Sequence, residues 1–237
     1  MNNCYIKIIY EVIFITTISE LALSKIKNGM PVSLGGGHNV FNLAQSIRQA
    51  KLDIQLCSPS ELTRLNCKNI GLKVDLLETI DHIDLAFDGC DNVDYNFNAL
   101  KSGGGIHLYE KIAAQMSDEY ILLLPSERIH KELSNKIPLC IEVAPPTVKQ
   151  VIQTGKTIGL KMEIRQGNEV AFLARSPQGN LLVDAFSSTW DDIDTIVSRL
   201  NNQNGVVATS YFQNVVTSLI TTNKNNDAIE IKKGDLK

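Results

Sequence analysis

The chain has 237 residues, of which 43% are hydrophobic and 21% are charged, which is the balance of a globular protein and excludes extended disorder. Its net charge is −3 and its isoelectric point is about 5.8, so bulk electrostatics does not favour binding to nucleic acid. The five cysteines form no CxxC pair and the histidines do not cluster. We therefore expect reduced thiols in a cytoplasmic protein, without a metal site.

The first segment, residues 4–18, is apolar and rich in β-branched side chains. Lys7 and Glu11 interrupt it, and it is shorter than the about 20 residues that a membrane-spanning helix requires. No small-residue cleavage site follows it. We expect a buried first segment of a soluble protein, either helix or strand, that does not associate with a membrane.

Apolar runs then alternate with helical patterns over the first half of the chain. The expected elements are a helix at 18–29, a strand, a glycine loop and a helix within 31–50, a strand at 52–58, a helix at 61–71, a strand at 82–89, a helix at 108–115 and a strand at 119–125. This alternation predicts an α/β fold with a Rossmann-like, mostly parallel sheet that is covered by helices.

The pattern changes near Ile137, where strands separated by turn signals follow one another. Pro145 and Pro146 come after a strand and are expected to begin a helix. Further predicted elements are strands at 161–166, 170–176 and 180–186 and a helix at 191–202. Together they predict a smaller α+β (ferredoxin-like) domain.

We expect this smaller domain to span residues 134–205 and to be inserted between two parts of the Rossmann-like domain, residues 1–133 and 206–237. Short apolar strands within 205–223 are expected to rejoin the first sheet. The polar tail that follows carries little structural signal.

The stretch from Asp88 to Glu110 concentrates more chemistry than any other part of the chain. Asp88 and Asp91 follow a buried strand, at the edge where open α/β sheets bind ligands. Lys101 precedes consecutive glycines that offer backbone N–H groups to an anion. Moving a proton next to a carbonyl requires a carboxylate base and a donor for the oxygen that gains charge. Glu110 and Lys101 are residues of the required types.

Each of these residues also has an ordinary structural explanation when it is taken alone. Glu110 and Lys111 could form a surface pair on a helix, and Lys101 could be a solvated side chain. Asp88 and Asp91 could form an Asx turn and a helix cap. Their combination in one short stretch favours a binding site.

The same stretch, DGCDNVD…LKSGGG…EKI, resembles the DGADE…KGGGGA…EK signature of type A ribose-5-phosphate isomerases, with the two aspartates, the lysine and the glutamate in register. Other segments are similar to that family in the same order, namely NGM followed by SLGGG, PLCIEVAPPTV, QGNLLVDAF and GVVATSYF. The chain is therefore identified as a divergent member of the family.

The resemblance implies an α/β domain with a smaller α+β lid domain, in a homodimer or homotetramer. It implies the interconversion of D-ribose 5-phosphate and D-ribulose 5-phosphate in the non-oxidative pentose phosphate pathway, without a metal or an organic cofactor. Glu110 takes the position of the base that moves a proton between C1 and C2. Asp88 and Asp91 take positions that contact the sugar hydroxyls and assist ring opening. Lys101 takes the position that stabilises the enediolate oxygen.

The chain departs from the family where the family contacts the substrate through a GTGST loop. Here the loop reads Gly35-Gly36-Gly37-His38-Asn39, so the hydroxyl groups are missing. Backbone N–H groups and the N-terminus of the following helix remain, and we expect Gly36, Gly37, His38 and Asn39 to contact the substrate. His38 could also be an ordinary residue of the first helical turn.

Two further departures concern substrate contacts. Arg128 stands where the family has a lysine on the phosphate, and an arginine binds phosphate with a different geometry. Ser102 replaces a glycine next to Gly103 and Gly104, and these three residues complete the predicted substrate-binding set.

The favoured function is thus a ribose-5-phosphate isomerase, and two alternatives stay open. One is isomerisation of another sugar. The other is a non-catalytic sugar-phosphate sensor, like the ligand domains of some sugar-responsive repressors. No helix-turn-helix pattern precedes the domain and the chain is acidic, which argues against the sensor.

Overall fold

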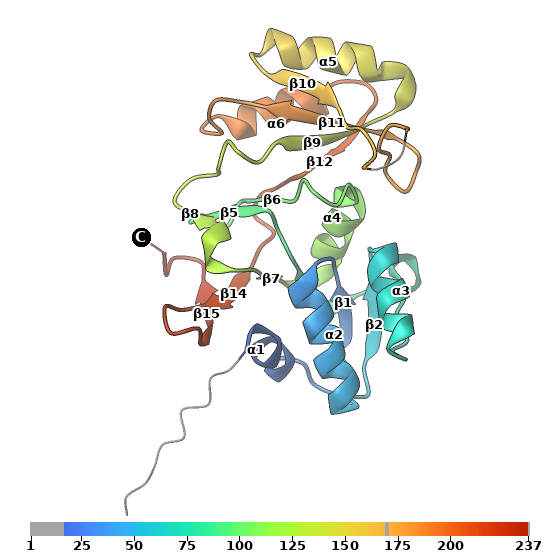
Figure 1. Ribbon diagram of the computed structural model, residues 1–237, viewed down its shortest axis with the longest axis vertical. Coiled ribbons are helices and arrows are strands. Elements are labelled where there is room, and N and C mark those ends of the chain that lie inside the picture. Colours follow the sequence, from blue (N-terminus) through green and yellow to red (C-terminus); the bar gives the residue numbers. More distant parts are fainter. Residues whose placement is uncertain (1–16, 169–170, 237) are drawn as a thin grey trace, which may run out of the picture.

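The computed structural model describes residues 17–168 and 171–236 (Figure 1). The N-terminal segment that we expect to be buried covers residues 4–18, and its residues 4–16 lie outside the described part. The first helix, α1 (Ile18–Ser24), begins with a capping box, in which Thr17 and Glu20 each accept a hydrogen bond from the other's backbone N–H. Within the described ranges, every helix is too short or too polar to cross a bilayer.

The main sheet has the strand order β15-β14-β7-β4-β1-β2-β3, and only the outermost pair, β14 and β15, is antiparallel. The strands are β1 (Pro31–Leu34), β2 (Gln55–Ser58), β3 (Asp75–Leu76), β4 (Ile83–Asp88), β7 (Ser117–Leu123), β14 (Ser218–Thr222) and β15 (Ala228–Lys232). This confirms the predicted mostly parallel, Rossmann-like sheet. Strand β15 forms within the polar tail, whose sequence carries little signal for it.

Helices cover both faces of this sheet (Figure 1). Helices α1, α2 (His38–Ala50) and α3 (Glu61–Asn69) pack on one face, and α4 (His107–Met116) packs on the other. Successive residues of β7 point to opposite faces, so Ile121 and Leu123 pack with α2 while Tyr120 and Leu122 pack with α4. Tyr120 thereby lies beneath the helix that carries Glu110.

A second sheet, β10-β11-β9-β12, is antiparallel throughout. Its elements run β9 (Leu139–Val143), α5 (Val148–Thr157), β10 (Lys161–Ile164), β11 (Leu181–Phe186), α6 (Ile193–Asn201) and β12 (Val206–Thr209). This βαββαβ order confirms the ferredoxin-like prediction. Pro145 and Pro146 form a 3-10 turn that leads into α5, as expected.

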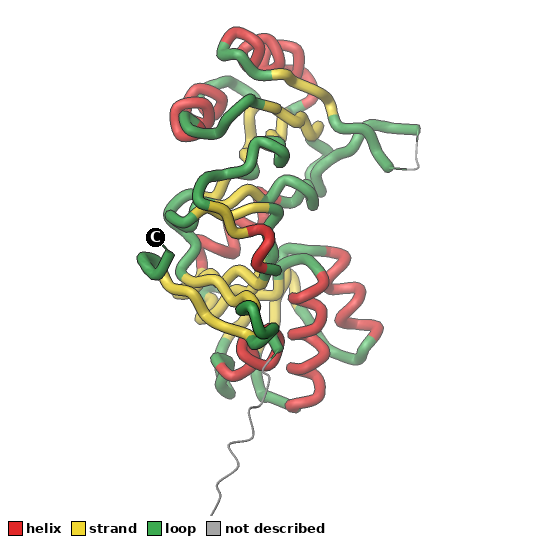
Figure 2. Tube along the Cα trace, turned by 60° about the vertical axis from the view of Figure 1, so that its left-hand side comes forward, coloured by secondary structure: helices red, strands yellow, loops and turns green. Residues whose placement is uncertain are grey.

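The strand predicted at 170–176 is wrong for the described residues 171–176. They form only isolated bridges, between Gln166 and Leu173 and between Arg175 and Leu181. The segment between β10 and β11 projects away from the rest of the molecule (Figure 2). Phe172, which lies in this segment, is 66% exposed, so the segment lacks the buried side chains that stabilise a regular strand.

The return to the main sheet is also later than expected. Strand β12 pairs with β9 in the smaller sheet, and the chain rejoins the main sheet only at β14. The domain boundaries at 133/134 and 205/206 stay a prediction.

A third sheet, β13-β6-β5-β8, lies between the two larger ones (Figure 1). Its strands are β5 (Asn92–Asp94), β6 (Ala99–Leu100), β8 (Ile129–His130) and β13 (Tyr211–Phe212). Strands this short show no alternation that sequence reading can detect. They matter because β5 and β6 carry the chain from Asp91 to Lys101.

Candidate active site

A cavity of about 780 Å³ opens at the carboxyl edge of the main sheet. The segments that follow β1, β2, β3 and β4 form most of its wall. The first turn of α4 and Arg128 complete it, and Pro177 reaches it from the smaller domain. This is the edge at which open α/β sheets bind their ligands.

Lys101 is the centre of the polar cluster in this cavity. Its Nζ lies 3.0 Å from Asp88 Oδ1 and 3.2 Å from Glu110 Oε1, and it donates to the carbonyl oxygen of Gly89. Burial alone lowers the pKa of Lys101, but the charges of Asp88 and Glu110 outweigh it and hold that pKa above its ordinary value. Lys101 is therefore an ammonium group held between two carboxyl groups.

Asp88 is held by donors on both of its carboxylate oxygens. Oδ1 accepts hydrogen bonds from the N–H groups of Gly36 (2.9 Å) and Gly89 (2.8 Å), and Oδ2 accepts one from the Tyr120 hydroxyl (2.9 Å). A Cβ at Gly35 would lie 2.1–2.5 Å from this carboxylate. Glycine is thus required at position 35 by the close approach of Asp88.

Glu110 projects from the first turn of α4 and is only 5% exposed. Burial raises the pKa of Glu110 to about 8, against the opposing charge of Lys101 and with the added charge of Asp88. A general base works best when its pKa lies near the operating pH. A pKa of about 8 is compatible with Glu110 taking up and releasing a proton near neutral pH.

Asp91 lies on the turn before β5 and lines the cavity. Its Oδ2 accepts hydrogen bonds from the N–H groups of Ser102 (2.6 Å) and Gly103 (2.8 Å). The N–H of Gly103 is consequently used within the protein, contrary to the expectation that the glycine run offers its N–H groups to an anion. Gly104 does line the cavity.

Some residues at the loop before α2 face the cavity, and others face the protein interior. Gly36, Gly37 and His38 line the cavity, and Gly37, with a φ of 105°, turns the chain into the N-terminus of α2. Asn39 is not part of the wall, because its Nδ2 donates to the carbonyl of Leu123 at 3.3 Å.

Ser102 is also turned away from the cavity. Its hydroxyl donates to the carbonyl of Pro138 at 2.5 Å and lies 2.9 Å from Ser210 Oγ. Arg128, in contrast, lines the cavity, and its Nη1 donates to the carbonyl of Cys90 at 2.6 Å.

Sequence reasoning missed Tyr120 and the wall that follows β2. Tyr120 sits in an apolar strand pattern, in which nothing marks its hydroxyl as a partner of Asp88. The part of the cavity wall that follows β2 carries Ser58, Ser60 and Arg64, and the Arg64 side chain donates to the carbonyl of Ser58 at 2.7 Å. Its only signal in the sequence is Ser60, the N-cap residue of α3.

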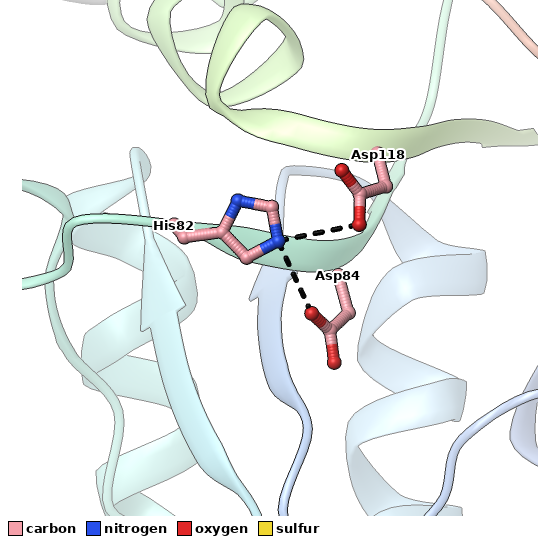
Figure 3. Close-up of side chains that lie close together, drawn as sticks. All are labelled: His82, Asp84 and Asp118. Carbon is pink, nitrogen blue, oxygen red and sulfur yellow. Dashed lines mark ion pairs between the residues drawn. The ribbon is translucent and has the colours of Figure 1, made fainter.

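Another cluster of titratable side chains lies at the opposite, amino end of β4 and β7 (Figure 3). His82 Nε2 lies 3.3 Å from Asp84 Oδ1 and 3.2 Å from Asp118 Oδ2. The register of β4 and β7 sets these aspartates side by side, and His82 bridges them. All three side chains are partly or fully exposed, which is typical of a surface ion-pair cluster.

The fold and the cavity define an α/β protein with a buried carboxylate–ammonium–carboxylate cluster at the edge of its parallel sheet. Residues 55–226 match the family ribose 5-phosphate isomerase A (phosphoriboisomerase A). Since this match covers most of the sequence, the chain belongs to the ribose 5-phosphate isomerase A family, as its motifs predict.

Relatives and solved structures agree with this family. Ribose-5-phosphate isomerase A of Bifidobacterium longum (strain DJO10A) is 30% identical over 215 residues, which cover 88% of this chain and 90% of the relative. The protein of that name from Prochlorococcus marinus (strain NATL1A) is 27% identical over 221 residues, with 91% and 94% covered.

Among solved structures, ribose 5-phosphate isomerase A from Methanocaldococcus jannaschii matches with a TM-score of 0.83 at 26% identity, covering 92% of this chain and 97% of that one. A D-ribose-5-phosphate isomerase in complex with phospho-erythronic acid matches with a TM-score of 0.84 at 25% identity, covering 91% and 96%.

Proposed function

We propose that this protein is an aldose–ketose isomerase that interconverts D-ribose 5-phosphate and D-ribulose 5-phosphate through an enediolate. The observation that carries the proposal is the position of Lys101 between Asp88 and Glu110 in the cavity of a chain of this family. A related isomerase whose structure contains phospho-erythronic acid supports a phosphorylated sugar derivative as the ligand class.

Glu110 is proposed as the base. Its carboxylate takes the proton from C2 of the open-chain aldose and returns it to C1, while the proton of the C2 hydroxyl passes to O1, so that C2 becomes the carbonyl and O1 the hydroxyl; the reverse reaction uses the same group. Lys101 stabilises the negative charge that develops on the substrate oxygen, from a site where burial strengthens the interaction. Such proton transfer needs no electron acceptor, and Lys101 supplies the positive charge beside the enediolate oxygen, so the proposal includes no cofactor and no metal.

Asp91 is proposed to contact the sugar hydroxyls and to assist ring opening, together with Asp88. The Oδ2 atom of Asp91 is used by Ser102 and Gly103, which leaves its Oδ1 atom for a hydroxyl group. Asp88 receives several donors from the protein and mainly fixes Lys101.

The phosphate is proposed to lie between the N-terminus of α2 and Arg128. Gly36, Gly37 and His38 line this part of the wall, at the positive N-terminal end of α2. Arg128 adds a guanidinium group, which suits a phosphate dianion.

The predicted contacts from Ser102, Gly103 and Asn39 are proposed to be indirect. Their polar groups bind other parts of the protein, as described above. We further propose a cytoplasmic homodimer or homotetramer, and the buried free thiols among the described cysteines support a reducing compartment.

The test is a coupled assay with ribose 5-phosphate, other pentose and hexose phosphates, and the free sugars. We expect turnover of ribose 5-phosphate, and we expect Glu110→Gln to lower kcat roughly 100- to 10,000-fold while binding persists. Glu142→Gln is the matched control, because Glu142 is fully buried but lies outside the cavity.

A Glu110→Gln variant that is as active as the parent would exclude Glu110 as the base. Tight binding of ribose 5-phosphate without turnover by the parent protein would instead support the sensor alternative. Turnover of another sugar in the panel instead of ribose 5-phosphate would change the assigned substrate but not the type of reaction.

A further inference from the structure

Tyr120 is a buried residue of β7 that touches the active site without lining the cavity. Its side chain is 1% exposed, and its hydroxyl donates to Asp88 Oδ2 at 2.9 Å. Its ring stacks on Phe212, with ring centroids 6.1 Å apart and an interplanar angle of 11°. The backbone N–H of Thr217 donates to the Tyr120 carbonyl at 2.9 Å and fixes the strand below the ring.

The donors around Asp88 are unequally divided between its two oxygens. Oδ1 accepts hydrogen bonds from Gly36 and Gly89 and pairs with Lys101, whereas Oδ2 has one donor within the described residues, the Tyr120 hydroxyl. Rotation of the carboxylate about its Cβ–Cγ bond would break this contact. The Tyr120 hydroxyl therefore sets the plane in which Asp88 presents Oδ1 to Lys101.

Tyr120 is also connected to the same ammonium group through Phe212. Phe212, on which the Tyr120 ring stacks, lies under Lys101, with Nζ 5.7 Å from the centroid of the Phe212 ring. This distance is within the range of a cation–π contact. Tyr120 thus acts on Lys101 from two sides, through Asp88 and through Phe212.

We propose that Tyr120 is a positioning residue of this active site, which holds Asp88 so that Lys101 stays aligned beside Glu110. The inference rests on the proposed isomerase function, since the aligned groups are those that move the proton and stabilise the enediolate oxygen. Removing the hydroxyl leaves Asp88 Oδ2 buried without its donor, so Asp88 and then Lys101 can shift by fractions of an ångström.

The test compares Tyr120→Phe with Tyr211→Phe in the full-length protein. Tyr211 is a matched control, because it is 4% exposed and its hydroxyl donates to Asp194 at 2.8 Å, away from the cavity. The Tyr120–Asp88 bond is a hydrogen bond to a charged group. If its loss weakens transition-state stabilisation by the energy of such a bond, kcat falls roughly 10- to 100-fold. We expect that decrease for Tyr120→Phe, with KM changed by less than about threefold, and an unchanged kcat for Tyr211→Phe.

A second measurement asks whether Tyr120 acts through Asp88. Adding Tyr120→Phe to an Asp88→Asn variant should lower kcat by less than about twofold, because the shared partner is already altered. The additional effect should be as large as in the parent if Tyr120 has a separate role, and that result would contradict the proposal.

Two outcomes separate this inference from the proposed function. A parent protein that isomerises ribose 5-phosphate, with Tyr120→Phe equally fast but less heat-stable, would show a purely structural tyrosine. A parent protein that is folded but inactive on every sugar of the panel would overturn the proposed function and this inference together.

Discussion

Glu110 and Lys101 show how one residue sets the chemistry available to its neighbour. Burial disfavours the charged form of both side chains, yet the pKa of both is raised, which keeps Lys101 charged and makes Glu110 easier to protonate. The pKa of Lys101 is raised because Asp88 and Glu110 surround it, whereas burial raises the pKa of Glu110 despite the nearby ammonium. A cation and a carboxyl group that can gain or lose a proton near neutral pH therefore lie side by side.

This arrangement predicts the pH dependence of the reaction. Because the pKa of Glu110 is raised to about 8 and the base must be deprotonated, kcat/KM should rise with pH through that value and level off above it. The measurement is kcat/KM between about pH 6 and pH 9. A profile that stays flat over this range would show that Glu110 is already ionised and would contradict the raised pKa.

The same pKa predicts an opposite trend in stability. The pKa of Glu110 is higher in the folded protein than the ordinary value of 4.5, so its contribution to stability is fully present below that value and is lost as pH rises through about 8. Glu110→Gln cannot ionise. Its melting temperature should therefore fall less than that of the parent between about pH 6 and pH 9.

At the scale of secondary-structure elements, the loop between β1 and α2 and the end of β4 fit closely together. Gly36 donates its N–H to Asp88, and Thr63 from α3 donates its hydroxyl to the carbonyl of Gly35 at 2.7 Å. The loop after β1, helix α3 and the end of β4 are thus joined by hydrogen bonds next to the Asp88 carboxylate. The absence of a side chain at Gly35 makes this approach possible.

Gly35→Ala is therefore expected to disturb the site. Its Cβ would overlap the Asp88 carboxylate, and the shift needed to relieve the overlap should lower the melting temperature by at least about 3 °C. Gly36→Ala is the comparison, because a Cβ there meets nothing within 4 Å. Equal melting temperatures for the two variants would mean that the loop moves freely and that Asp88 is not fixed by it.

At the scale of the whole molecule, the smaller domain contributes directly to the site. Arg165 forms a two-contact ion pair with Asp184 in the smaller domain (2.5 and 2.9 Å) and donates to the carbonyl of Gly103 at 3.2 Å. A bidentate pair of this kind orients the guanidinium group strongly. Pro177, in the segment between β10 and β11, adds to the cavity wall.

Arg165→Ala is expected to weaken substrate binding more than it slows the reaction. Loss of the contact to Gly103 frees the glycine run next to Asp91, and KM should rise roughly tenfold. Arg175→Ala is a suitable control, since among the described residues the Arg175 side chain donates to the carbonyl of Gly179, within the same projecting segment. A KM for Arg165→Ala that matches that of Arg175→Ala would show that the domain contact has no role in binding.

The sequence by itself determined the fold class and the chemical groups of the site. Alternating strand and helix patterns depend on local periodicity, and Asp88, Asp91, Lys101 and Glu110 lie in one short stretch, so both can be read without knowledge of distant contacts. The errors are local too: the strand predicted at 170–176 fails because the structure leaves its apolar side exposed.

Only the tertiary structure decided which polar groups face the cavity. Asn39 and Ser102 bind distant carbonyls instead, and the Tyr120 hydroxyl meets Asp88 from another strand. The pairing of β12 with β9 and the short strands of the third sheet likewise depend on partners far away in the chain. The physical reason is the same in each case, because a buried polar group takes the partner that folding brings within hydrogen-bond distance, and local sequence does not specify that partner.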